Sequence, residues 1–110
     1  MKHTADLIAG LEVHEDAMQR NLGISRGAIV SEAVMMGLGK TLGRSYAHDL
    51  VYDLCREASE QDKPLLDLLS ANEEVSQKLT REELERLCDP ANYLGYSVEM
   101  VNKILRQTEQ

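Results

Sequence analysis

The feature that most constrains the fold is an apolar stretch inside the segment 21–44. Residues 28–38 are apolar at all but three positions. This stretch is too short and too interrupted to cross a bilayer, which takes roughly 20 apolar residues in a row. A helix that is apolar on most sides has to be surrounded by other elements. We therefore expect it to form the central rod of a helical cluster.

Helical periodicity also dominates the rest of the chain. Between Ala47 and Ala58, apolar side chains recur at i, i+3, i+4, i+7, i+8 and i+11, which indicates one helix face packed on a core. No stretch alternates between apolar and polar residues as a strand does. A chain of 110 residues has the usual size of one domain. The sequence thus predicts a single compact all-α domain over residues 1–110, with about six to eight helices around a buried central helix.

Capping residues predict where several helices begin and end. Gly39 and Gly43 are interpreted as C-caps or turn residues that close the central helix. Ser45 is a suitable N-cap for the helix that follows. Thr80 and Glu83 have the spacing of a capping box, in which each satisfies a backbone N–H near the helix start.

A final helix is predicted from Ser97, and we expect the tail 107–110 to fray. Its apolar residues have the spacing of one helix face, which we expect to point into the core. These residues are Val98, Val101, Ile104 and Leu105.

The charge balance and the termini limit the possible partners and compartment. The formal net charge is −7 and the basic residues are scattered, which argues against nucleic-acid binding. No segment suggests a membrane partner. Cys55 and Cys88 form no metal or redox motif and are interpreted as buried free thiols in a reducing compartment. The N-terminal segment has no signal-peptide core, so the sequence predicts a cytoplasmic protein.

Two local motifs suggest chemistry but are better explained as structure. Residues 37–41, Gly-Leu-Gly-Lys-Thr, resemble the end of a phosphate-binding loop, yet Val34 stands where its first glycine belongs. These glycines also close a helix, where the dipole repels phosphate. His14 begins a zinc-protease-like motif, but Met18 stands where its second histidine belongs. No metal site and no cofactor are predicted.

The remaining candidates are single charged residues. His48 has Asp49 beside it but no nucleophile that can be identified as its partner. Arg26 and Arg44 flank the central helix, and each is a candidate for binding an anionic substrate group. Structural pairing with acids such as Glu32 or Asp49 is the favoured alternative. No set of catalytic residues can be assembled from the sequence, so the chain alone is not expected to be catalytic.

The order of four segments resembles the C-terminal domain of the fumarase/aspartase superfamily. The segments read NLGISRGAIVSEAVMMGL, LGRSYAHDLVYDL, KPLLDLLSANEEV and LTREELERLCDPANYLG. The resemblance is most specific at Gly43-Arg44 with Ala47-His48 and at Asp89-Pro90. Within the superfamily the chain is most similar to the 3-carboxy-cis,cis-muconate cycloisomerase family and next to adenylosuccinate lyase.

The resemblance implies a role inside a larger enzyme. Such enzymes are helical homotetramers whose active sites form where subunits meet, and they cleave or form bonds β to a carboxylate. The superfamily's mobile Gly-Ser-Ser loop with the catalytic serine is absent from this chain, so no catalytic residue carries over. The implied partners are the remainder of the parent enzyme and its other subunits. The parent would be a cycloisomerase of aromatic degradation.

Two alternatives stay open beside the cycloisomerase domain. One is the C-terminal domain of an adenylosuccinate lyase of purine synthesis, and the other is a free-standing helical protein-interaction module. In either fragment hypothesis, part of the surface would lack its partner. The segment with Leu7, Ile8 and Leu11 is the expected exposed patch, through which the isolated domain would dimerise or swap.

Overall fold

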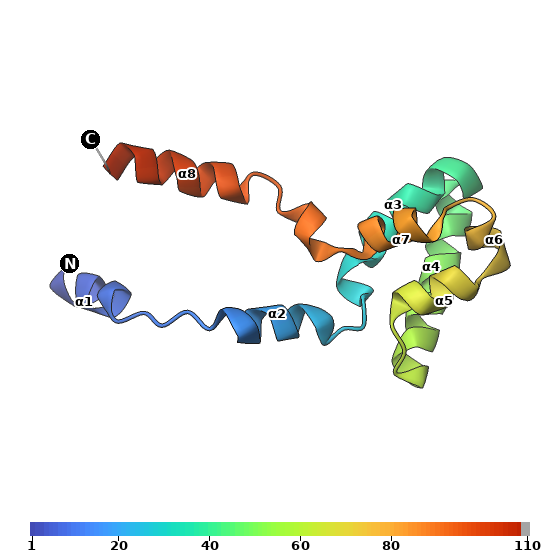
Figure 1. Ribbon diagram of the computed structural model, residues 1–110, viewed down its shortest axis with the longest axis horizontal. Helices are drawn as coiled ribbons and strands as arrows, with labels where there is room; N and C mark the ends of the chain where they lie inside the picture. The colour runs from blue at the N-terminus through green and yellow to red at the C-terminus, as the bar shows by residue number, and fades with distance from the viewer. Residues whose placement is uncertain (109–110) are drawn as a thin grey trace.

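The computed structural model describes residues 1–108, and within that range the chain is helical, with no strand. Eight α-helices and two short 3-10 helices follow one another in sequence (Figure 1). The predicted all-α class, with six to eight helices, is confirmed. The elements are α1 (Lys2–Ala9), α2 (Glu15–Gly23), η1 (Ala28–Val30), α3 (Ser31–Leu42), α4 (Arg44–Gln61), α5 (Leu65–Ala71), α6 (Glu73–Ser76), α7 (Arg81–Cys88), η2 (Pro90–Tyr93) and α8 (Ser97–Thr108).

Helices α3 to α7 form a compact cluster in which α3 is the central element. Val34 and Leu38 on α3 are fully buried, as the apolar stretch predicted. The predicted stripe of α4 packs on the same core, because four of its members are buried and all of these except Ala58 belong to that core. These are Ala47, Val51, Leu54 and Ala58. Leu65, Leu69, Val75 and Leu84 from α5, α6 and α7 complete the buried core.

Helices α3 and α7 approach closely at Gly37. A Cβ atom at Gly37 would lie 2.8 Å from Cδ1 of Leu87, which is closer than carbon atoms pack. Glycine in a helix interior costs about 1 kcal/mol relative to alanine. The close contact with α7 gives a physical reason for glycine at this position.

The helix boundaries partly follow the predictions. Gly43 ends α3 as expected, and its φ of +86° turns the chain directly into α4. Gly39 lies inside α3, so its interpretation as a cap is wrong. Helix α4 begins at Arg44, so Ser45 is its second residue and not its N-cap. A one-residue glycine turn leaves no room for the longer connection that the prediction assumed.

The capping box before α7 is confirmed. The Thr80 hydroxyl accepts a hydrogen bond from the Glu83 N–H, and the Glu83 carboxylate accepts from the Thr80 N–H at 2.8 Å. The Thr80 backbone N–H, with the Thr80 hydroxyl beside it, lowers the pKa of the Glu83 carboxyl. The start of α7 is thus fixed by local interactions that the sequence spacing predicted.

Two arms extend from the cluster in the same direction, one formed by α1 and α2 and the other by α8 (Figure 1). The chain measures 58 × 29 × 23 Å, and its radius of gyration is 18.8 Å. A compact domain of this length has a radius of gyration of about 13 Å. The arms therefore add little to the core that α3 to α7 build.

The inward orientation predicted for the last helix is wrong. Val101 and Ile104 are each 58% exposed, and no residue of α8 is buried. The spacing correctly predicted an apolar face, but the described chain offers no surface that covers it. Helix α8 includes residues 107 and 108 of the predicted tail, while residues 109 and 110 lie outside the described residues.

No helix within the described residues is long and apolar enough to span a membrane.

We predict that Gly37→Val destabilises the cluster by about 1–3 kcal/mol, because the new side chain overpacks the contact between α3 and α7. Urea denaturation followed by circular dichroism measures the free energy of unfolding. In a Leu87→Ala background the same change should cost less, since the opposing side chain is gone. Gly23→Val is the matched control, because a Cβ at Gly23 meets nothing within 4 Å. Equal costs at Gly23 and Gly37 would contradict this packing role.

Candidate functional site

Arg26 forms hydrogen bonds that hold the fold together. Its Nε and Nη2 atoms donate hydrogen bonds to the two carboxylate oxygens of Asp62, at 2.9 and 3.1 Å. Its backbone carbonyl accepts a hydrogen bond of 2.8 Å from the Leu65 N–H. Both contacts join the segment before α3 to the connection between α4 and α5. The pairing partner is thus Asp62, and not Glu32 or Asp49 as the sequence suggested.

The turn that presents Arg26 is conformationally demanding. Arg26 and Gly27 have φ values of +53° and +97°, and Asp62 opposite has a φ of +50°. A Cβ at Gly27 would also lie 3.1 Å from Cβ of Leu65, so glycine relieves both the backbone strain and the crowding. These residues hold the entry to α3 against the rest of the cluster. A role for Arg26 in substrate binding stays a prediction.

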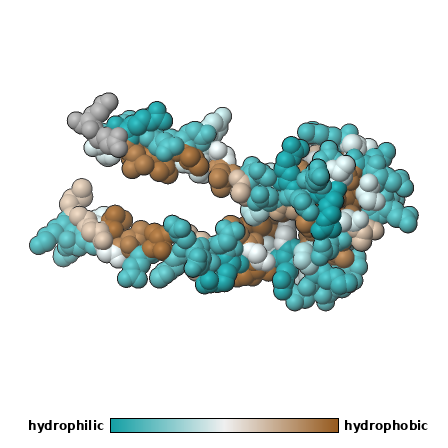
Figure 2. All heavy atoms as spheres, in the orientation of Figure 1, coloured by the Kyte–Doolittle hydropathy of each residue, from teal (hydrophilic) through white to brown (hydrophobic). Residues whose placement is uncertain are grey.

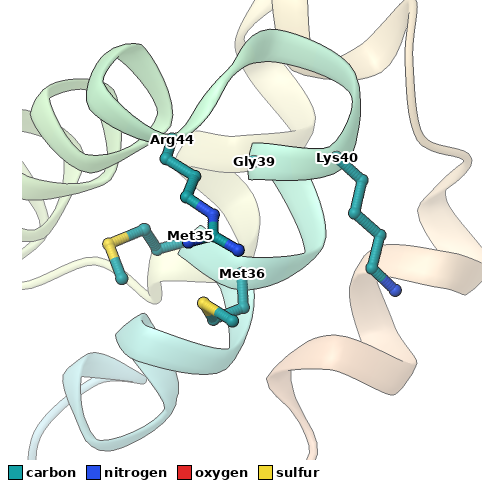
Figure 3. A pocket seen from close by; sticks show the side chains of 5 residues that line it. All are labelled: Met35, Met36, Gly39, Lys40 and Arg44. Atoms are coloured by element: carbon teal, nitrogen blue, oxygen red, sulfur yellow. The ribbon is translucent and has the colours of Figure 1, made fainter.

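Arg44 lies in a different environment, at the mouth of a cavity of about 250 Å³. The cavity is lined by Met35, Met36, Gly39, Lys40 and Arg44, and we call it the Arg44 pocket. In Figure 3, Arg44 extends from the start of α4 toward Met36, and Lys40 extends from α3 on the other side of Gly39. Within residues 1–108, neither cation takes part in an ion pair.

The residues around Arg44 include some that the sequence did not single out. The sequence pointed to Lys40 only as part of the phosphate-loop resemblance. It pointed to Met35 and Met36 only as members of the apolar stretch. The structure places residues 37–41 inside the second half of α3, so they form no phosphate-binding loop. The signal that was available is the spacing of Met36 and Lys40, which at i, i+4 share a helix face.

His48 lies on the outer side of α4. Its Nδ1 is 3.2 Å from the Asp49 carboxylate, and it shares a cavity of about 270 Å³ with Cys55. Burial raises the pKa of the Cys55 thiol, which disfavours the thiolate that a nucleophile needs. Burial likewise raises the pKa of Cys88 to about 11. Both cysteines are free and half-buried, and neither is an activated nucleophile.

The other polar candidates remain on the surface. His14 and Glu12 are largely exposed, with 3.7 Å between the His14 Nε2 atom and the Glu12 carboxylate. Across residues 1–108, no three His, Cys, Asp or Glu side chains gather in a way that could hold a metal ion.

A cavity of about 760 Å³ lies where the arms leave the cluster. Residues from α2, η1, α3 and η2 line it, and its apolar part includes Leu22, Ile29 and Leu94. It opens to the surface near the arms, so the exposed apolar surface continues from the arms onto the cluster.

The arms have apolar faces with no cover in the described chain. Leu7, Ile8 and Leu11 are 61–69% exposed, so the expected exposed patch is confirmed. In Figure 2, apolar atoms gather on the sides of α1 and α8 that face each other across an open gap. The members of this face on α8 are Val98, Val101, Ile104 and Leu105, all more than half exposed.

Comparisons with known proteins place this arrangement in a family. The family model described as adenylosuccinate lyase C-terminus matches residues 27–104. The chain is 61% identical over 99 residues to trans-aconitate decarboxylase 1 of Mycosarcoma maydis, covering 90% of this chain and 20% of that protein. It is 40% identical over 107 residues to 3-carboxy-cis,cis-muconate cycloisomerase of Pseudomonas aeruginosa, covering 97% of this chain and 23% of that protein.

A solved structure shows the same fold. The crystal structure of a fumarate lyase from Mesorhizobium sp. BNC1 superposes with a TM-score of 0.79 at 48% identity, covering 87% of this chain and 23% of that one. The chain thus spans about a fifth to a quarter of the length of these relatives.

We predict that the Arg26–Asp62 pair contributes under about 1 kcal/mol, because both side chains are exposed and solvent screens their charges. A double-mutant cycle with Arg26→Gln and Asp62→Asn isolates this coupling energy from urea denaturation curves. Both substitutions keep a Cβ, so the strain of the positive φ is unchanged. The coupling should shrink at high salt. A coupling of zero at low salt would show that the pair does not join the two segments.

Proposed function

Because the chain belongs to the adenylosuccinate lyase C-terminus family of the fumarase/aspartase superfamily, we propose that residues 1–110 form the C-terminal domain of a larger enzyme. In this proposal the α3–α7 cluster folds on its own core, and the two arms dock on the remainder of the parent enzyme. The observation that carries the proposal is the uncovered apolar face of the arms.

The solvent-accessible surface area of the chain supports the proposal that a partner is missing. The chain exposes 8814 Å², whereas a compact monomer of this mass exposes about 6,100 Å². The excess is therefore about 2,700 Å² (8814 minus about 6,100). Obligate interfaces bury about 2,000–5,000 Å² over both partners. The excess on this one chain is thus enough for an obligate interface.

The chemistry of α8 supports the same conclusion. Val98, Val101 and Leu105 recur at i, i+3 and i+7, which gives one continuous apolar stripe. Polar residues occupy the opposite side, including Glu99 and Lys103. A helix of this pattern lies on an apolar surface with its charged side in water. The apolar residues of α1 provide the matching face on the other arm.

The relatives' names suggest the substrate class. The names of the two relatives compared above refer to trans-aconitate and to 3-carboxy-cis,cis-muconate, which are both anions with several carboxylates. The identity of 61% supports decarboxylation of trans-aconitate as the parent activity, with the cycloisomerase of aromatic degradation as the second candidate. Adenylosuccinate cleavage is the third, on the family description.

The resemblance also suggests how the parent is assembled. A homotetramer in the cytoplasm is the arrangement we propose, with the arms contributing to contacts inside or between subunits. The chain supplies no assigned catalytic residue, so the chemistry would reside in the remainder of the parent. A free-standing interaction module would need a partner that covers the same arms.

We predict that the full-length parent decarboxylates trans-aconitate, and that the 110-residue chain alone is inactive on any of the three substrates. Product formation from trans-aconitate, 3-carboxy-cis,cis-muconate and adenylosuccinate measures this directly. Activity of the parent on only one of the latter two would contradict the decarboxylase proposal. Activity of the chain alone would contradict its role as a non-catalytic domain.

The same assay tests the arms through a matched pair of variants of the parent. Val101→Asp places a charge on the apolar face of α8 and should reduce both activity and the fraction of assembled oligomer. Lys103→Asp introduces the same residue on the polar face of the same helix and should leave both unchanged. Equal effects of the two variants would contradict docking through the apolar face.

A further inference from the structure

The Arg44 pocket has one cation on each side and an apolar floor. Arg44 and Lys40 border the cavity from two different helices, and Met35 and Met36 provide its hydrophobic surface (Figure 3). Met36 is 54% exposed, so the floor of the pocket is open to a ligand. The arrangement combines charge with hydrophobic contact in a cavity of about 250 Å³.

The charge of this pocket is unusual for the chain. The protein has 19 acidic and 12 basic residues, yet no acidic residue lines the pocket. Three other cavities each include at least one carboxylate, from Glu32, Asp89, Glu15 or Asp16.

The start of α4 strengthens the positive character. Arg44 is the first residue of this 18-residue helix, whose first turn contains no acidic residue and whose N-terminus has no side-chain cap. The positive end of the α4 dipole therefore lies beside the guanidinium, where it offsets the negative end of the α3 dipole at Gly39 and Lys40. The two cations in the lining define a site for a negatively charged group.

Gly39 keeps the space between the cations open. A Cβ at this position would lie 3.6 Å from Cγ of Arg44, which is ordinary contact. Alanine here would therefore fit without strain while occupying part of the lining. A Gly39→Ala variant therefore tests the space in the pocket without a loss of stability in α3.

We propose that the Arg44 pocket binds one carboxylate of a small polycarboxylate anion. The Arg44 guanidinium would hold the carboxylate through two hydrogen bonds, as its planar fork allows. Lys40 would add a second positive charge, and Met35 and Met36 would contact the carbon chain of the ligand. Small-molecule sites usually measure about 300–1,000 Å³, so this pocket holds only part of such a ligand. The proposal concerns the chain itself and does not depend on which reaction the parent catalyses.

The methionine methyl groups allow a direct test. The chain contains five methionines, of which Met35 and Met36 line the pocket and Met18 and Met100 lie on the arms. With ¹³C-labelled methionine methyls, titration with trans-aconitate should shift the Met35 and Met36 signals in a saturable way. The signals of Met18 and Met100 should not move.

Matched variants separate binding from folding. Arg44→Gln and Lys40→Gln should each weaken the affinity, by about tenfold or more for Arg44, as loss of a charge-assisted hydrogen bond requires. Gly39→Ala should weaken it by filling the pocket while keeping or raising the thermal stability, since alanine favours helix. Lys63→Gln removes a cation outside the pocket and should leave the affinity unchanged.

Several results would overturn the proposal. These are the absence of a saturable shift, equal shifts of all methionine signals, or equal weakening by Lys63→Gln. Binding of the neutral trimethyl ester with the same affinity would show that the carboxylate is not recognised. Equal binding of inorganic phosphate would contradict the carboxylate class.

Discussion

The packing of α3 against α4 is the interaction on which the rest of the structure depends. Val34 and Leu38 are completely buried between the helices of the cluster, and burying a side chain of this kind contributes about 1.5–3 kcal/mol. Gly43 makes this packing possible because it turns the chain from one helix into the next in a single residue. The same turn places Arg44 beside the last turn of α3, so the fold and the proposed anion pocket share one origin.

The molecule has one part that buries its apolar surface and another part whose apolar surface is exposed. In the cluster, α5, α6 and α7 close the core around α3 and α4. In the arms, the apolar faces of α1 and α8 remain exposed, although both helices have regular apolar spacing. Short helices in isolation are marginally stable in water. Their presence as arms is therefore explained most simply by a surface of the parent enzyme on which they lie.

Local sequence signals predicted local structure well. The α4 stripe and the Thr80–Glu83 capping box were both predictable, because their interactions span a few residues. Long-range relations were not. Arg26 and Asp62 are 36 positions apart, and both adopt a positive φ where they meet. For α8, periodicity identified the apolar face but contains no information on what covers it. For the Arg44 pocket, the sequence predicted Arg44 but not its neighbours, because only the turn at Gly43 brings α4 beside the last turn of α3.

Hydrogen exchange of the arm amides, in the chain alone and in the full-length parent, tests the central claim most directly. If the arms dock on the parent, amides of α1 and α8 exchange rapidly in the isolated chain and become strongly protected in the parent. The amides of α3 and α4 should be protected in both, because their core is complete. Equally rapid exchange of α1 and α8 in the parent would contradict docking of the arms.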